Sequence, residues 1–151
     1  MKSIKPTPAK SAHIQGFIAS DHRGFWLKDY LKRKFLLVDL GTTSDSKMVD
    51  EVDYANKLVK YVLKEKSKGI LICGSGFGMD IAANRHKGIR ATLCHSIDDA
   101  DWARQHTDAN IIVLSAEFTN GAFAERIVKK FFTTKFSGLS RYKRRIQKMD
   151  K

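Results

Sequence analysis

The sequence has no long hydrophobic segment. No apolar run approaches the roughly 20 residues that a membrane-spanning helix needs, so we expect no membrane partner. Residues 1–13 are basic and polar, without the apolar stretch or small-residue cleavage site of a secretory signal. We expect these 13 residues to form a flexible basic leader. No internal repeat, low-complexity segment or linker divides the remainder, so residues 14–151 are predicted to form one domain.

Cysteine is scarce. The only two, Cys73 and Cys94, are too few for a disulfide framework. Each follows an apolar run, which is typical of reduced, half-buried thiols. We therefore expect a cytoplasmic protein, because thiols stay reduced in that compartment.

Acidic residues are nearly absent from the C-terminal end. Residues 126–151 hold ten lysines and arginines and one acid, Asp150, and the whole chain carries a net charge of +12. Such a segment could meet nucleic acid, an acidic surface or a phosphorylated substrate. It has few aromatic residues in a stacking pattern and no RNA-binding signature. We therefore predict no nucleic-acid partner and a largely solvated basic helix or tail.

Short apolar runs alternate with amphipathic stretches along the chain. The runs are rich in β-branched residues and apolar on both faces, as in strands that are covered on both sides. Asp50 is a candidate helix N-cap, Ser96 to Asp99 resembles a capping box, and 120–132 reads as a helix. The pattern predicts a Rossmann-like three-layer α/β/α sandwich with a five-stranded parallel sheet. The expected strands are 16–20, 36–40, 69–73, 89–94 and 110–115.

Ligands of such sheets bind at the carboxyl ends of the strands. This rule selects four candidate loops, which are 20–24, 41–50, 73–78 and 94–99.

The loop 73–78, in the stretch GILICGSGFGM, is rich in glycine but lacks the nucleotide-binding motifs. Met79 stands where a dinucleotide fingerprint has its third glycine, and no lysine is present for a P-loop. Glycines do allow backbone N–H groups to converge on a small oxyanion at a helix N-terminus. The same field should favour the thiolate of Cys73 and make it a usable base. A core cysteine beside a tight turn explains the local sequence equally well.

Two histidines could join this thiol. Asp21 and His22 directly follow the first predicted strand, at the same edge of the sheet as Cys73. His106 ends the helix after the fourth strand, where it either interacts with the helix dipole or points into the site.

These motifs resemble the ribose-5-phosphate isomerase B family, which also includes galactose-6-phosphate isomerase subunits. The resemblance begins near residue 14 and is carried by IASDHRGFWLKDYLK, VDLGT, the 48-residue block GILICGSGFGMDIAANRHKGIRATLCHSIDDADWARQHTDANIIVLSA and the terminal RYKRR. It implies an aldose–ketose isomerase that needs no metal or organic cofactor. It also implies a homodimer, or a dimer of dimers, with active sites shared at the subunit interface.

The resemblance also implies roles for individual residues. Cys73 matches the base that removes the proton next to the carbonyl, and His106 the histidine that assists ring opening. Asp21 and His22 match the pair that contacts the sugar. The remaining implied residues are the enediolate-binding Ser75, Gly74, Gly76 and Gly78, the substrate-binding Asn110, and the phosphate-binding Arg141 and Arg145.

Five positions depart from the family pattern. Glu51 and Val52 stand where many members have Tyr-Pro, and Tyr142 stands where a histidine is common. Glu117 replaces a common arginine, whereas Arg23 replaces a small residue. We hypothesise that Arg23 supplies the positive charge that Glu117 does not, or that the two side chains pair directly.

Three functions follow in order of preference. The first is interconversion of ribose 5-phosphate and ribulose 5-phosphate in the pentose phosphate pathway, and the second is isomerisation of a six-carbon sugar phosphate of the galactose or allose type. The third is a non-catalytic module that binds a phosphate or nucleic acid. The presence of Cys73, Asp21 and His106 favours an enzyme, because only turnover needs a base.

Overall fold

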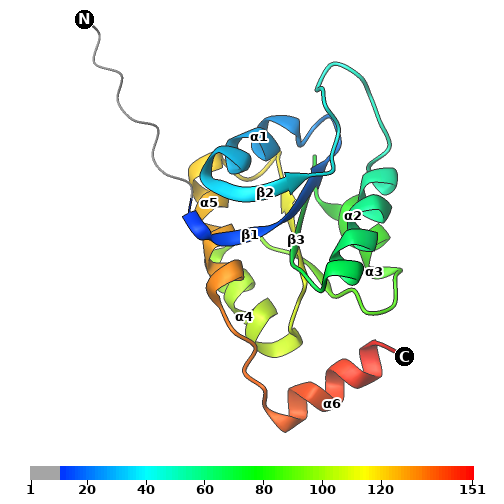
Figure 1. Ribbon diagram of the computed structural model, residues 1–151, viewed down its shortest axis with the longest axis vertical. Helices are drawn as coiled ribbons and strands as arrows, with labels where there is room; N and C mark the ends of the chain where they lie inside the picture. The colour runs from blue at the N-terminus through cyan, green and yellow to red at the C-terminus, as the bar shows by residue number, and fades with distance from the viewer. Residues whose placement is uncertain (1–10) are drawn as a thin grey trace, which may run out of the picture.

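The computed structural model describes residues 11–151 and contains one five-stranded parallel sheet (Figure 1). All paired neighbours run parallel, and the strand order is β2-β1-β3-β5-β4. The predicted sheet is therefore confirmed. The strands are β1 (Ser11–Ser20), β2 (Phe35–Asp39), β3 (Gly69–Cys73), β4 (Ala91–Leu93) and β5 (Ile111–Ser115).

The predicted basic leader, 1–13, lies mostly outside the described residues. Strand β1 begins at Ser11, three residues before residue 14, where the domain was predicted to start.

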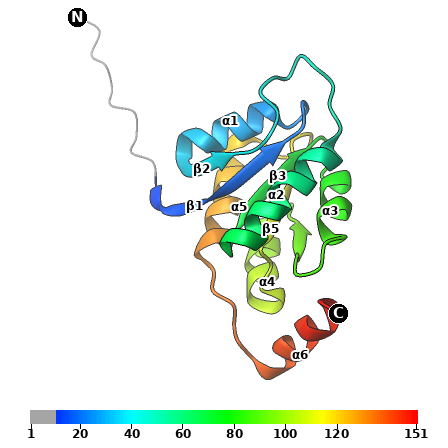
Figure 2. The same cartoon turned by 45° about the vertical axis from the view of Figure 1, so that its right-hand side comes forward.

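Helices cover both faces of the sheet (Figures 1 and 2). One face packs against α1, α4 and α5, and the other against α2 and α3. The predicted three-layer sandwich is thus confirmed. The helices are α1 (Phe25–Lys34), α2 (Glu51–Glu65), α3 (Phe77–Asn84), α4 (Ile97–Thr107), α5 (Gly121–Thr133) and α6 (Ser140–Met149).

Strand β3 shows how the sequence divides its side chains between the two layers. Every residue of this strand is buried, and successive side chains point to opposite faces. Ile70 and Ile72 join the cluster beneath α1, α4 and α5. Leu71 and Cys73 join the cluster beneath α2 and α3. The Cys73 thiol therefore faces the layer formed by α2 and α3, and the glycine loop leads directly into α3.

Three helix starts test the predicted capping signals. Ser96 and Asp99 form the predicted capping box at the start of α4. Asn120 caps α5, its side chain accepting a hydrogen bond from the N–H of Phe123. Asp50 occupies the N-cap position of α2 as predicted, but its side chain makes no capping hydrogen bond. This carboxylate is therefore not used by the helix that it precedes.

The strand order reverses between β1 and β3, which creates a crevice at their carboxyl ends. Ser20 at the end of β1 pairs with Ile72 of β3. Residues that follow these two strands are consequently close neighbours at one edge of the sheet.

Helix α6 is set apart from the rest of the domain. It has no buried residue, and it lies beside the end of α4 in both ribbon views (Figures 1 and 2). An ion pair of 2.7 Å between Arg90 and Asp150 ties its C-terminal end to the domain. The predicted basic C-terminal helix is therefore formed, but the chain's own core does not bury it.

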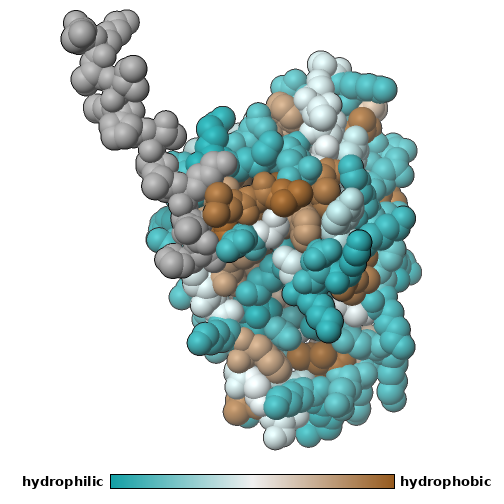
Figure 3. All heavy atoms as spheres, viewed as in Figure 1, coloured by the Kyte–Doolittle hydropathy of each residue, from teal (hydrophilic) through white to brown (hydrophobic). Residues whose placement is uncertain are grey.

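Hydrophobic side chains gather over the edge strand β2 in the space-filling view (Figure 3), where Leu36 and Val38 are exposed. None of the helices in residues 11–151 is both long and apolar enough to cross a membrane.

Candidate active site

A pocket opens at the carboxyl ends of β1 and β3. It combines the predicted residues Asp21, His22, Cys73, Gly74, Ser75 and Gly78 with Arg23, Met48, Val49, Asp50 and Glu51. Three of the four predicted loops meet here, namely those after β1, β2 and β3. The fourth, 94–99, contributes no residue to this pocket.

Cys73 lies at the floor of the pocket. Its side chain is almost completely buried, and its Sγ accepts a hydrogen bond of 3.2 Å from the N–H of Gly76. Gly76 has a φ of +88°, a conformation that favours glycine, and it turns the chain into α3. The sulfur therefore sits beneath the N-terminus of a helix, as the sequence predicts.

The expected effect of the loop's N–H groups on the pKa of this thiol is present, but burial outweighs it. Burial raises the pKa of Cys73 above its ordinary value, and the negative charges of Asp21 and Glu51 raise it further. The N–H groups of Met79 and Gly76 act in the opposite direction but do not outweigh burial. The glycine-rich sequence predicted the amide donors. The burial of the sulfur was not predictable in this way, because it depends on packing by segments that are distant in the sequence. Cys73 is thus mainly protonated at neutral pH in the free protein.

Asp21 fastens the start of α1 to the floor of the site. Its Oδ1 accepts hydrogen bonds of 3.0 Å from the N–H groups of Arg23 and Gly24. Burial raises the pKa of Asp21, although these two N–H groups and the charge of His22 lower it. One carboxylate oxygen is therefore committed to the backbone, and the role of Asp21 is at least partly structural.

His22 is oriented by the loop between β2 and α2. Its Nδ1 accepts a hydrogen bond of 3.2 Å from the N–H of Val49. In a neutral imidazole the proton then resides on Nε2. His22 can therefore donate a hydrogen bond to a ligand oxygen.

The glycine loop presents its backbone to the pocket. The carbonyl of Gly74 accepts hydrogen bonds from the N–H of Glu117, at 3.0 Å, and from the hydroxyl of Ser115, at 2.7 Å. Ser75 accepts a bond of 3.3 Å from the N–H of Phe77, the first residue of α3. These bonds hold the loop with its N–H groups at a helix N-terminus, a geometry that suits a small oxyanion.

Arg23 and Glu117 pair directly, which confirms that part of the hypothesis from sequence. Their side chains are joined at 3.0 Å, and they are 54% and 59% exposed. A methyl group on Gly74 would collide with the guanidinium of Arg23. The arginine consequently lies flat against the glycine loop and places a positive charge at one end of it.

A second cluster gathers around His106 instead of around Cys73. The His106 ring stacks on Tyr142 of α6, with ring centroids 4.7 Å apart, and lies 6.2 Å from the ring of Trp102. The guanidinium groups of Arg141 and Arg145 lie over Tyr142 at 4.7 and 5.6 Å. Tyr142, noted from sequence only as a departure from the family pattern, is thus the centre of the cluster.

Cys73 lies at the carboxyl ends of the strands, whereas this cluster lies at their amino ends. Helix α4 begins at the carboxyl edge and runs back, so that His106 in its last turn lies at the amino edge, beside α6 (Figure 2). None of His106, Arg141 and Arg145 lines the Cys73 pocket. Within one chain, the predicted site is therefore divided into two separate halves.

Asn110 does not join the Cys73 pocket either. It lies just before β5, at the amino edge of the sheet, where its side-chain oxygen accepts a hydrogen bond of 2.9 Å from Arg90 N–H and its amide donates one of 2.8 Å to the carbonyl of Gly88. These bonds tie together the segments before β4 and β5. Within this chain Asn110 is a structural bridge, and its predicted contact with a substrate stays a prediction.

Among residues 11–151, no three His, Cys, Asp or Glu side chains are grouped so that they could hold a metal ion. The chemistry that this chain's own residues offer is proton transfer at a thiol, hydrogen bonding by amides and carboxylates, and anion binding by arginine.

A buried thiol beneath the N–H groups of a glycine loop is an arrangement that suits an enzyme of the proton-transfer class. The model of the family described as Ribose/Galactose Isomerase matches residues 17–149. The chain therefore belongs to this family.

Similar proteins of known structure support this assignment. The crystal structure of a ribose 5-phosphate isomerase from Thermotoga maritima is 44% identical, with a TM-score of 0.85 over 91% of this chain and 98% of that one. A type B ribose 5-phosphate isomerase from Trypanosoma brucei is 38% identical, with a TM-score of 0.85 over 90% and 96% of the two chains. Ribose-5-phosphate isomerase B of Escherichia coli is 35% identical over 84% of this chain and 88% of its own.

Proposed function

We propose that this protein is an aldose–ketose isomerase that interconverts ribose 5-phosphate and ribulose 5-phosphate, a reaction of the pentose phosphate pathway. The observation that carries the proposal is a buried thiol placed under the amides of the glycine loop, in a chain that belongs to the sugar isomerase family. Several of its relatives are named for this reaction.

Cys73 acts as the base in the proposed mechanism. The Sγ thiolate takes the proton from C2 of the open-chain aldose, the C–H electron pair forms the C1–C2 double bond, and O1 takes the negative charge. The proton then returns from Sγ to C1 while the O2 hydroxyl proton moves to O1, which yields the ketose. Burial makes the thiolate rarer, but it also makes each thiolate a stronger base.

The glycine loop stabilises the intermediate. Amide groups that are held in place before the reaction bind a developing oxyanion without reorganising. The loop around Gly74 and Gly76 is fixed by hydrogen bonds from β5 and by its entry into α3. Arg23 adds a positive charge beside it.

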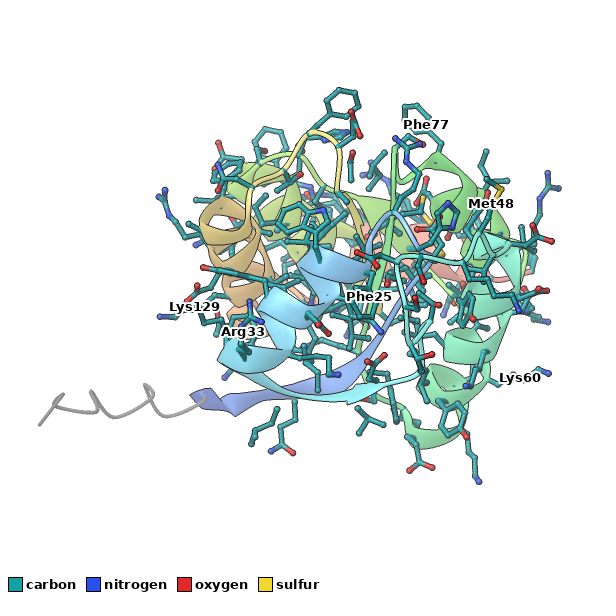
Figure 4. The ribbon with its side chains drawn as sticks, turned by 90° about the horizontal axis from the view of Figure 1, so that it is seen from above. Phe25, Arg33, Met48, Lys60, Phe77 and Lys129 are labelled. Carbon is teal, nitrogen blue, oxygen red and sulfur yellow. The ribbon has the colours of Figure 1, made fainter. Side chains whose placement is uncertain are left out.

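The two halves of the site come together in a homodimer. The partner's His106 would assist ring opening, and the partner's Arg141 and Arg145 would bind the phosphate through their planar donor groups. Large apolar side chains are exposed on both halves, as is typical of surfaces that meet a partner. Phe77 and Met48 lie on the same side of the molecule in the view from above (Figure 4), and Trp102 is exposed beside His106.

A reducing compartment such as the cytoplasm suits this mechanism. Both cysteines are free thiols, and the proposed base works only while it stays reduced.

An isomerase assay with the purified protein on five- and six-carbon sugar phosphates tests the function. We expect the highest kcat/KM with ribose 5-phosphate, and a higher value with galactose 6-phosphate or allose 6-phosphate would favour the six-carbon alternative. Binding of these sugars with no turnover of any of them would contradict the proposal and favour a phosphate-binding module.

A further inference from the structure

Two carboxylates that line the Cys73 pocket, Asp50 and Glu51, have no hydrogen-bonding partner among residues 11–151. Glu51 lines the pocket, yet within residues 11–151 no group donates a hydrogen bond to its side chain and no cation pairs with it. Asp21, by contrast, commits its Oδ1 to two N–H groups. Asp50 is exposed to solvent, whereas Glu51 is half-buried against the glycine loop, so Glu51 is the unpaired carboxylate that is placed to bind a ligand in this pocket.

The position of Glu51 is fixed by the fold. It is the first residue of α2, a helix that is anchored in the core by Ala55, Leu58 and Val62. A methyl group on Gly78 would collide with the Glu51 carboxylate. The carboxylate is thus held against the end of the glycine loop opposite to Arg23.

Glu51 and Cys73 influence each other electrostatically. The charge of Glu51 contributes to the raised pKa values of both Cys73 and Asp21, so these groups share one poorly hydrated space. A carboxylate near the place where an enediolate forms is unfavourable unless donors satisfy it. A phosphate offers no such donors at neutral pH, whereas the hydroxyl groups of a sugar do.

We propose that Glu51 accepts a hydrogen bond from a hydroxyl group of the sugar chain, and that it thereby determines which sugar phosphates are turned over. The inference rests on the proposed function and extends it. Many family members have a tyrosine at this position, whose hydroxyl can donate. A tyrosine hydroxyl can also accept, whereas an ionised carboxylate can only accept, so in this chain the position requires a donor such as a sugar hydroxyl.

The test compares Glu51→Gln with Asp53→Asn on three substrates. Asp53 is exposed in the same first turn of α2 and does not line the pocket, so both variants remove one negative charge from the same helix end. The substrates are ribose 5-phosphate and its 3-deoxy and 4-deoxy analogues, each measured by kcat/KM with the purified, full-length protein.

For Glu51→Gln we expect kcat/KM on ribose 5-phosphate to fall about 10- to 100-fold, the range for a hydrogen bond to a charged group. The loss should shrink below about 3-fold on the one analogue that lacks the contacted hydroxyl, because nothing remains there for the carboxylate to bind. Asp53→Asn should behave as wild type on all three. An equal loss on all three substrates, or no loss on any, overturns the inference. Changes in Cys73 ionisation are common to the three substrates and cancel in this comparison.

Alkylation of Cys73 by iodoacetamide separates this inference from the proposed function. If the wild-type protein isomerises none of the sugars, the proposed function is wrong. The readout is then the ribose 5-phosphate concentration that halves the rate of Cys73 alkylation. We expect that concentration to rise about 10-fold or more in Glu51→Gln and to stay unchanged in Asp53→Asn; an unchanged value in Glu51→Gln overturns the inference.

Discussion

The Cys73 pocket and the His106 cluster are built in opposite ways. Around Cys73, the groups are buried, and their orientation is set by backbone hydrogen bonds at the ends of central strands. Around His106, exposed cations lie over an aromatic ring on α6, a helix with no buried residue. The first half is organised by the core of the chain itself, whereas the second is attached to the core by few contacts.

This difference matches the chemistry that we propose for each half. Proton abstraction and oxyanion stabilisation need donors that are fixed before the substrate arrives. Phosphate binding needs charge and planar donors, which flexible arginines on an exposed helix supply. If the two halves meet only in a dimer, assembly of the subunits completes the site. The predictions below test whether the halves differ in role as they differ in construction.

The largest effect is expected from removing the thiol. Cys73→Ala should lower kcat by about 10³- to 10⁴-fold, because it removes the proposed base. Binding of ribose 5-phosphate, measured by calorimetry, should change little, since we propose that the other half binds the phosphate. Turnover within 10-fold of wild type would show that Cys73 is not the base.

Mixing two inactive variants tests whether the halves come from different subunits. Cys73→Ala and Arg145→Ala damage opposite halves, so a mixed dimer has one site with both changes and one site with neither. After exchange of subunits at equal concentrations, about half of the dimers are mixed, and we expect about a quarter of wild-type activity.

The control for this experiment mixes subunits that carry Cys73→Ala with subunits that carry His22→Ala. Cys73 and His22 lie in the same half of the site. In a mixed dimer each site therefore takes this half from one of the two variants and lacks either the thiol or the imidazole. No activity should return. Recovery with this pair, or failure of the first pair in a confirmed dimer, would contradict the shared site.

The pH dependence should reflect the burial of Cys73. Because burial raises the pKa of this thiol, the thiolate is the minor form at neutral pH and its fraction rises as the pH increases. We therefore expect kcat/KM, and the rate of alkylation of Cys73 by iodoacetamide, to rise up to about tenfold per pH unit above neutrality.

Cys94 provides the internal control for alkylation. It is fully buried, and burial together with Asp99 and Asp80 raises its pKa to about 12. It should remain unmodified over the same pH range. A Cys73 alkylation rate that is already constant at pH 7 would mean that the amides of the loop prevail over burial.

The sequence was most informative where local pattern decides the structure. Buried strands, the capping box at Ser96 and the glycine loop after Cys73 are set by neighbours in the chain, and all three were predictable. The pKa of Cys73 was not, because burial depends on segments that are remote in sequence. Cys73 and His106 lie at opposite ends of the strands because α4 runs back from the carboxyl ends to the amino ends. The resemblance alone did not reveal this separation.

Resemblance alone also says little about contacts within this chain. It assigned Asn110 to the substrate, and within the chain both of its polar groups bind backbone; Tyr142 appeared only as a substitution, although it organises the second cluster. The pairing of Arg23 with Glu117 was predictable because two opposite charge changes occurred at the same edge of the sheet.

The smallest effects are expected at this pair. Arg23→Ala should lower kcat/KM about fivefold, the equivalent of roughly 1 kcal/mol for a solvent-screened charge near the oxyanion. The free energy of unfolding, measured by urea denaturation, should change by less than about 1 kcal/mol, because both side chains are more than half exposed. Glu117→Gln keeps Arg23 but weakens its anchor, so its loss of kcat/KM should be smaller than that of Arg23→Ala. Equal losses in the two variants would mean that the pair acts as a structural clamp on the glycine loop, and that the positive charge of Arg23 does not serve the reaction.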